Sequence, residues 1–161
     1  MHELTDVAIT TITQLIYELD GRTWNLMMRA LAHGIDIVEL AEFERLLQEP
    51  TSDMSRRCFT QYELEKAGDG HRRTERLAAR FAAKEAVLKA LGTGWVTGIS
   101  WKDIELRNAT NGAPSINVFG EVERLAGEKG IASFLVSLAH SNGLAVASVI
   151  GIGPDSPTSP K

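Results

Sequence analysis

Two acidic residues occupy positions where a globular protein rarely places a negative charge. Asp36 lies in the apolar segment 34–38, and Glu85 lies in the segment 81–91, which is rich in Ala, Val and Leu. A carboxylate carried toward an apolar interior loses hydration and is tolerated only with a partner such as a cation or a set of donors. Two such carboxylates, far apart in sequence, are most simply interpreted as two ligands of one hard metal ion.

Glu85 taken alone has a simpler explanation. Lys89 follows it by one helical turn. An exposed Glu-to-Lys pair at this spacing supports a helix by roughly 0.3 kcal/mol. This explanation leaves Asp36 unaccounted for, whereas a metal site accounts for both residues.

Other patterns that often mark function are incomplete. The glycines at 92, 94 and 98 lack the spacing of a dinucleotide or P-loop motif, although they could let backbone amides approach a phosphate. His140 precedes a turn of Ser, Asn and Gly, where both functional and ordinary histidines occur. No G-x-S-x-G nucleophile elbow surrounds it, and neither H-E-x-x-H nor clustered cysteines indicate zinc.

The composition is that of one globular domain. The 161 residues are 43% apolar and 24% charged, and the net charge of −4 does not favour nucleic acid as a partner. Basic residues gather between 56 and 89, which is typical either of a solvated helix face or of a site for a phosphorylated ligand or an acidic protein.

Cysteine usage and hydropathy predict the compartment. The single cysteine, Cys58, is expected to be a buried structural thiol in a reducing compartment. No apolar run is long enough for a membrane span, and the N-terminus lacks a basic signal region. We therefore expect a cytoplasmic protein without a membrane partner.

The apolar periodicity predicts an α+β fold, with a largely antiparallel sheet packed on one long central helix. Strands are expected at 31–40, 101–107, 115–118, 131–139 and 144–150, with a hairpin turn at 111–112. Helices are expected at 7–19, shortly after residue 40, after a Thr60–Glu63 capping box, at 73–91 and at 121–129. The chain is expected to divide into a helical N-terminal extension at 1–28, a main domain at 29–151 and a disordered tail at 152–161.

Three segments together resemble the holo-acyl-carrier-protein synthase family, the short class of 4′-phosphopantetheinyl transferases. They are GIDIVEL at 34–40, FTQYEL at 59–64 and RFAAKEAVLKALGTG at 80–94. The segments NGAP at 111–114 and VSLAH at 136–140 match in order and spacing as well. The resemblance covers residues 29–150 and implies the phosphopantetheinyl transferase-like α+β fold.

The resemblance implies a reaction and a site. Coenzyme A would donate its phosphopantetheine arm to a serine of an apo acyl carrier protein and leave adenosine 3′,5′-bisphosphate, a step of fatty acid biosynthesis and lipid metabolism. Asp36 and Glu85 would bind Mg²⁺, and Lys89 would neutralise phosphate charge. Either a metal-ligating carboxylate or a metal-bound water would accept the serine proton. Further contacts with coenzyme A are implied for Arg80, Lys84, Lys89, Gly92, Gly94, Pro114 and His140.

The resemblance also implies partners. The carrier is expected to present an acidic helix beside its serine, for which Arg45, Arg56 and Arg57 are candidate contacts. Relatives are typically homotrimers with active sites between protomers. A homotrimer is therefore expected here.

The chain departs from the family pattern in two regions. Many more residues precede the first strand than in most relatives, so Met27 or Met28 is a candidate start and residues 1–26 are either a leader or an added helix. Ala139 and the pair at 142–143 differ from the residues that relatives often carry. These differences bear on the contacts of His140 and leave the two carboxylates unchanged.

Two other functions compete with the transferase. A non-catalytic coenzyme A or nucleotide-binding module would bind coenzyme A with Mg²⁺ but transfer nothing. A small metal-dependent phosphohydrolase would release adenosine bisphosphate without a carrier. The intact carboxylate pair and Lys89 favour the transferase over the binding module.

Overall fold

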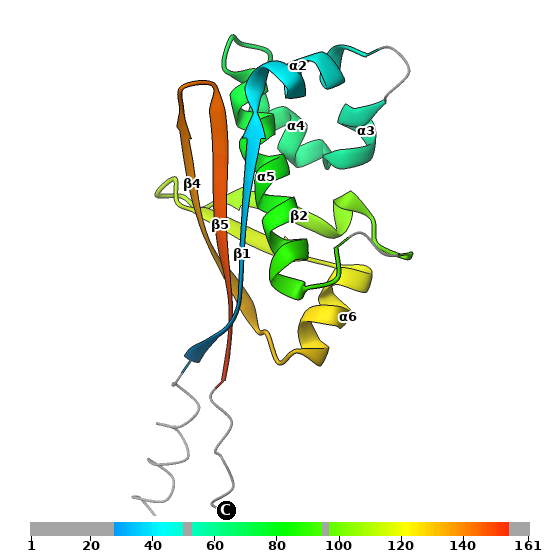
Figure 1. Cartoon of the computed structure of the whole chain (residues 1–161), viewed down its shortest axis with the longest axis vertical. Helices are drawn as coiled ribbons and strands as arrows, with labels where there is room; N and C mark the ends of the chain where they lie inside the picture. The colour runs from blue at the N-terminus through cyan, green and yellow to red at the C-terminus, as the bar shows by residue number, and fades with distance from the viewer. Residues whose placement is uncertain (1–27, 50–52, 95–96, 155–161) are drawn as a thin grey trace, which may run out of the picture.

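A computed structural model describes residues 28–49, 53–94 and 97–154 of the chain (Figure 1). The helix expected at 7–19 lies outside these residues. None of the helices in the described ranges is long and apolar enough to cross a bilayer.

A three-stranded antiparallel sheet forms the centre of the fold. β1 (Met28–Glu39) and β4 (Ser133–Ser141) each pair with β5 (Leu144–Pro154), which gives the order β1-β5-β4. Asn142 and Gly143 join β4 to β5 with positive φ angles, as a two-residue hairpin turn requires. Met28 pairs with Pro154 at the end of the sheet. The expected extension at 1–28 therefore includes the first residue of β1, and the expected tail at 152–161 includes the last three residues of β5.

A second, smaller sheet is the hairpin of β2 (Ile104–Asn108) and β3 (Pro114–Val118). The strand expected at 101–107 begins instead with a short 3-10 helix, η1 (Trp101–Asp103). A capping box between Ser100 and Asp103 stabilises this turn, because each side chain accepts a hydrogen bond from backbone at the other end. α6 (Gly120–Glu128) then leads back to the central sheet.

The long helix α5 (Arg73–Leu91) lies along β1 and β5, and it begins and ends where the sequence predicts. Gly92 follows it in the left-handed conformation with φ of 67°. Its buried surface holds both small and large apolar residues. In the core shared with the sheet these are Ala82, Ala83, Ala86, Val87, Leu88 and Leu91. Ala78 and Ala90 of the same helix are buried as well.

Three short helices form the remaining layer: α2 (Leu40–Gln48), α3 (Met54–Cys58) and α4 (Gln61–Ala67). The Thr60–Glu63 capping box begins α4, as predicted. Cys58 is buried at 5% exposure, and burial raises the pKa of its thiol. The labelled helices all lie on one side of the three-stranded sheet (Figure 1). The predicted α+β class, with a mainly antiparallel sheet against one long helix, is confirmed.

Candidate active site

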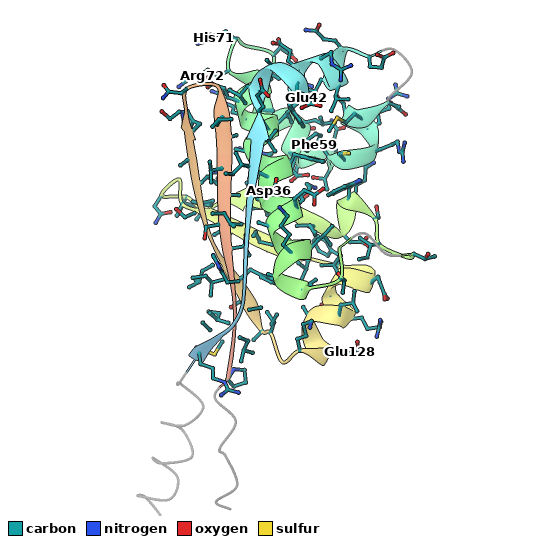
Figure 2. The ribbon with its side chains drawn as sticks, viewed as in Figure 1. Asp36, Glu42, Phe59, His71, Arg72 and Glu128 are labelled. Atoms are coloured by element: carbon teal, nitrogen blue, oxygen red, sulfur yellow. The ribbon has the colours of Figure 1, made fainter. Side chains whose placement is uncertain are left out.

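Asp36 is held against α5 by the register of the sheet and by a glycine. It lies opposite Ala147, which packs in the core with α5, so Asp36 is on the same face of the sheet. Two residues earlier, Gly34 brings β1 so close to α5 that a Cβ there would lie 2.0 Å from the carbonyl oxygen of Ala86. Gly-x-Asp on β1 thus places the Asp36 side chain beside the helix (Figure 2).

Lys89 of α5 contacts this carboxylate directly. Its Nζ donates a hydrogen bond of 2.7 Å to Oδ1 of Asp36. This hydrogen bond raises the pKa of Lys89, because the contact favours the charged ammonium. One end of the predicted site is therefore assembled from residues 53 positions apart in the chain.

Glu85 lies one helical turn before Lys89 and faces the same space. Burial raises the pKa of its carboxyl, the negative charge of Asp36 raises it further, and Lys89 opposes the shift. The two carboxylates line one cavity of about 270 Å³. The other lining residues come from β1, α2 and α5, and they are Ile37, Val38, Glu39, Glu42, Phe43, Leu46 and Phe81.

The donor set of this cavity suits a hard divalent cation. Glu85 carries a desolvated carboxylate beside a second negative charge, and both are oxygen ligands of the kind that Mg²⁺ prefers. In the described ranges, no group of three or more His, Cys, Asp or Glu side chains is arranged to hold a metal ion. Mg²⁺ is usually held by one or two carboxylates together with substrate phosphates, and this pair matches that arrangement.

Lys84 does not contribute to this cavity, contrary to its expected role as a contact for coenzyme A. Its side chain is fully buried on another face of α5 and does not line the cavity. The ammonium contacts Oε2 of Glu63 at 2.8 Å and donates to the carbonyl oxygens of Trp101 and Ile104. With its donors engaged and no exposed surface, Lys84 cannot reach a phosphate in this arrangement.

Arg80 also lies away from the two carboxylates. Its guanidinium donates to the backbone oxygen of Arg76 at 2.9 Å and to Oδ1 of Asn108 at 3.4 Å. Burial lowers the pKa of this side chain, and its Nε has no hydrogen-bond partner within the described residues. Arg80 therefore faces the β2–β3 hairpin, and its predicted contact with coenzyme A stays a prediction.

The remaining predicted contacts are spread over the molecule. Gly92 and Gly94 follow α5 with positive φ and open space around them, one turn beyond Lys89. Pro114 begins β3, and His140 is exposed on β4, separated from β1 by β5. Neither Pro114 nor His140 lines the cavity that holds Asp36 and Glu85. One protomer therefore does not gather all the predicted residues into one cavity.

The predicted basic residues lie beyond the cavity, on α2 and α3. Arg56 and Arg57 are exposed and line a second cavity of about 410 Å³ together with Lys102. Arg45 is exposed in the last turn of α2. A third, mainly apolar cavity of about 260 Å³ lies next to both of these cavities. It shares the lining residue Phe81 with the carboxylate cavity and Arg57 with the basic one.

The sequence interpretation missed the residues that support the site from behind. Glu63 was recognised as part of a capping box, but its contact with Lys84 was not expected. Phe81 is half-buried and lines two cavities, which its place in an apolar helical segment does not indicate. A lysine directly after two alanines, in the middle of a long helix, was an available signal, because a buried ammonium needs a buried acid.

The chain belongs to the 4′-phosphopantetheinyl transferase superfamily, whose sequence model matches residues 32–146. A holo-[acyl-carrier-protein] synthase of Geobacter sp. (strain M21) is 43% identical over 117 residues, which are 73% of this chain and 94% of that protein. The family resemblance carried by the three sequence segments is thereby confirmed.

Solved structures of similar proteins share the fold. The holo-[acyl-carrier-protein] synthase from Neisseria meningitidis aligns with a TM-score of 0.69 and 28% identity, over 76% of this chain and 98% of that one. A holo-(acyl-carrier-protein) synthase from Bacillus anthracis, in complex with CoA (3′,5′-ADP), aligns with a TM-score of 0.63 and 36% identity. That alignment covers 79% of this chain and 99% of the other.

Proposed function

We propose that this chain transfers the 4′-phosphopantetheine group from coenzyme A to a serine of an apo acyl carrier protein, with Mg²⁺ as the metal. The observation that carries the proposal is the convergence of Asp36 and Glu85 on one cavity, in a chain whose relatives are holo-[acyl-carrier-protein] synthases. The B. anthracis relative binds coenzyme A or its adenosine bisphosphate part, which is the donor that the proposal requires.

The proposed step is a phosphoryl-type transfer. The serine hydroxyl gives its proton to a metal-ligating carboxylate or to a water, and its oxygen forms a bond to the phosphorus that carries pantetheine. The bond from that phosphorus to the bridging oxygen breaks, and adenosine 3′,5′-bisphosphate leaves. Asp36 and Glu85 would hold the cation, which acts as a Lewis acid when bound. Lys89 adds a positive charge beside the same carboxylates and would offset charge on the phosphate oxygens.

The carrier is proposed to dock over α2 and α3. Exposed Arg56 and Arg57, with Lys102, form the basic end of this docking surface. This end would face an acidic helix of the carrier. The apolar cavity between the basic end and the carboxylates would receive apolar side chains beside the serine. Arg45 is proposed as a further contact at the end of α2.

The chain is proposed to act as a homotrimer. The face of the sheet turned away from α5 is exposed and apolar, with Ile35 at 50%, Ile37 at 59% and Leu135 at 56% exposure. Apolar surface of this kind commonly marks an interface between protomers. Active sites shared between protomers would also explain why Pro114 and His140 lie apart from Asp36 within one chain.

The proposed location of the enzyme is the cytoplasm. Cys58 is a free, buried thiol, which suits a reducing compartment.

Intact-mass spectrometry tests the proposed transfer. Purified protein with coenzyme A and Mg²⁺ should raise the mass of an apo acyl carrier protein by one phosphopantetheine, and Asp36→Asn and Glu85→Gln should each lower the rate roughly 10³-fold. Glu121→Gln neutralises a partly exposed acid of α6 that does not line the cavity, and it should leave the rate unchanged. Near-normal activity in either site variant would reject the metal-site assignment.

The same assay separates the alternatives. No mass gain with a panel of fatty-acid and polyketide carriers, together with Mg²⁺-dependent binding of coenzyme A, would favour a binding module. Release of adenosine bisphosphate in the absence of a carrier would favour a phosphohydrolase.

A further inference from the structure

A buried ion pair lies on a different face of α5 from Glu85 and outside the cavity of the candidate active site. Lys84 and Glu63 contact each other at 2.8 Å, and neither side chain has exposed surface. Lys84 also donates to the carbonyl oxygen of Trp101 at 2.9 Å and to that of Ile104. Three acceptors in three directions match the three protons of an ammonium.

Glu63 is fully engaged as well. Its Oε2 accepts from the backbone N–H of Thr60 at 2.9 Å, and its Oε1 accepts from the backbone N–H of Leu106 at 3.0 Å. The pair therefore connects α5 with the start of α4, with η1 and with β2. A helix held by such directional bonds cannot turn about its axis or slide along it without breaking several of them.

The rest of the contact between α5 and the sheet is less specific about helix position. In the core that α5 shares with the sheet, the helix contributes Ala82, Ala83 and Ala86 beside Val87, Leu88 and Leu91, and such apolar contacts are non-directional. A buried ion pair adds little net stability compared with apolar residues of similar volume. Its directional contacts can nevertheless select one rotation and one axial position of the helix.

We propose that Glu63 and Lys84 are positioning residues for the metal site. Lys84 directly precedes Glu85, so the bonds of Lys84 fix where the Glu85 carboxylate lies relative to Asp36 on β1. This inference rests on the proposed function, because it assumes that Asp36 and Glu85 bind a divalent cation. It adds a role for two side chains that touch neither the cation nor the substrate.

The test is the double variant Glu63→Gln with Lys84→Met, which removes both charges at nearly constant volume. Each single variant would leave one buried charge unpaired and so confuse folding with positioning. The double variant should keep its circular dichroism spectrum and cooperative melting. It should bind Mn²⁺, measured by electron paramagnetic resonance, roughly tenfold or more weakly than the wild type. The Mg²⁺ concentration for half-maximal transfer should rise by a similar factor.

The matched control is Glu121→Gln with Arg124→Met, which removes an exposed ion pair of α6. It should leave Mn²⁺ binding unchanged. If the double variant at 63 and 84 does not fold, Glu63→Asp replaces it, because this variant keeps both charges and shortens the acid that holds Lys84. Wild-type Mn²⁺ affinity in the folded double variant, or in Glu63→Asp, would overturn the positioning role.

The outcomes distinguish this inference from the function on which it rests. If the wild type itself does not bind Mn²⁺, or if Asp36→Asn binds it as well as the wild type does, the metal site fails. If the wild type binds Mn²⁺ and Asp36→Asn does not, the metal site stands, and the double variant alone decides the positioning role.

Discussion

The two carboxylates of the cavity are in an unfavourable arrangement when no cation accompanies them. Glu85 is partly desolvated and lies near the negative charge of Asp36, while Lys89 offsets only part of the repulsion. Such an arrangement lowers the stability of the folded protein, which is common at active sites. Stability measurements can therefore test the role of these residues without an activity assay.

Glu85→Gln should make the metal-free protein more stable at neutral pH. Because the pKa of Glu85 is raised, the folded protein holds this proton more tightly than the unfolded chain does. The stability that the protonated carboxyl contributes is fully present below its ordinary pKa of 4.5 and is lost as the pH rises through the raised value. Thermal melting in chelator should therefore show a higher midpoint for Glu85→Gln at pH 7, with the difference vanishing toward pH 4.5.

Added Mg²⁺ supplies the control for this comparison. It should raise the melting temperature of the wild type and leave that of Glu85→Gln unchanged, since only a protein that binds the ion is stabilised by it. If Glu85→Gln melts below the wild type at pH 7 in chelator, the charged Glu85 side chain does not destabilise the metal-free protein, and this prediction is wrong.

At the scale of elements, the site depends on how closely β1 approaches α5. Gly34 permits this approach, because any side chain there would collide with the backbone of the helix at Ala86 and Ala90. The same contact sets the separation between Asp36 on the strand and Lys89 on the helix. Packing and site geometry are thus controlled at one position.

Gly34→Ala should therefore weaken both folding and metal binding. The added methyl would force the strand and helix apart at a cost of about 3 kcal/mol in unfolding free energy, measured with urea. Mn²⁺ affinity should fall in the fraction that folds, since Asp36 moves with the strand. Gly127→Ala is the matched control, because a Cβ there meets nothing within 4 Å and alanine favours a helix. Wild-type stability in Gly34→Ala would show that the two elements can separate freely.

At the scale of the whole molecule, the described helices leave one face of the central sheet uncovered. The helices occupy the other face (Figure 1), and the outer rows of the sheet carry exposed isoleucine and leucine. A domain of this size gains by burying such surface against copies of itself. The proposed trimer is the arrangement that would do so and complete the site.

Leu135→Arg should dissociate this assembly. An arginine at the centre of an apolar interface would bury a charge without a partner, so the variant should sediment as a monomer where the wild type sediments as a trimer. Transfer activity should fall with the trimer fraction if the sites lie between protomers. Phe119→Arg changes another exposed apolar residue, away from the sheet, and should remain trimeric. A monomeric, active wild type would refute the proposed assembly.

Much of this protein could be predicted from local patterns in its sequence. The bounds of α5 and the Thr60–Glu63 capping box depend on neighbouring residues, and both are confirmed. The family likewise followed from short segments whose order and spacing are visible in the chain. Asp36 and Glu85 stood out because each charge interrupts an apolar segment, a signal that needs no knowledge of the fold.

The tertiary structure decided which of the charged residues meet. Lys84 and Lys89 lie on one helix, five residues apart, yet Lys84 is buried against Glu63 while Lys89 contacts Asp36. Helical spacing predicts which side chains share a face of the helix. Whether that face is buried or lines the cavity depends on the strands and helices that pack against it. That choice is made by contacts between residues far apart in the chain, which no local pattern contains.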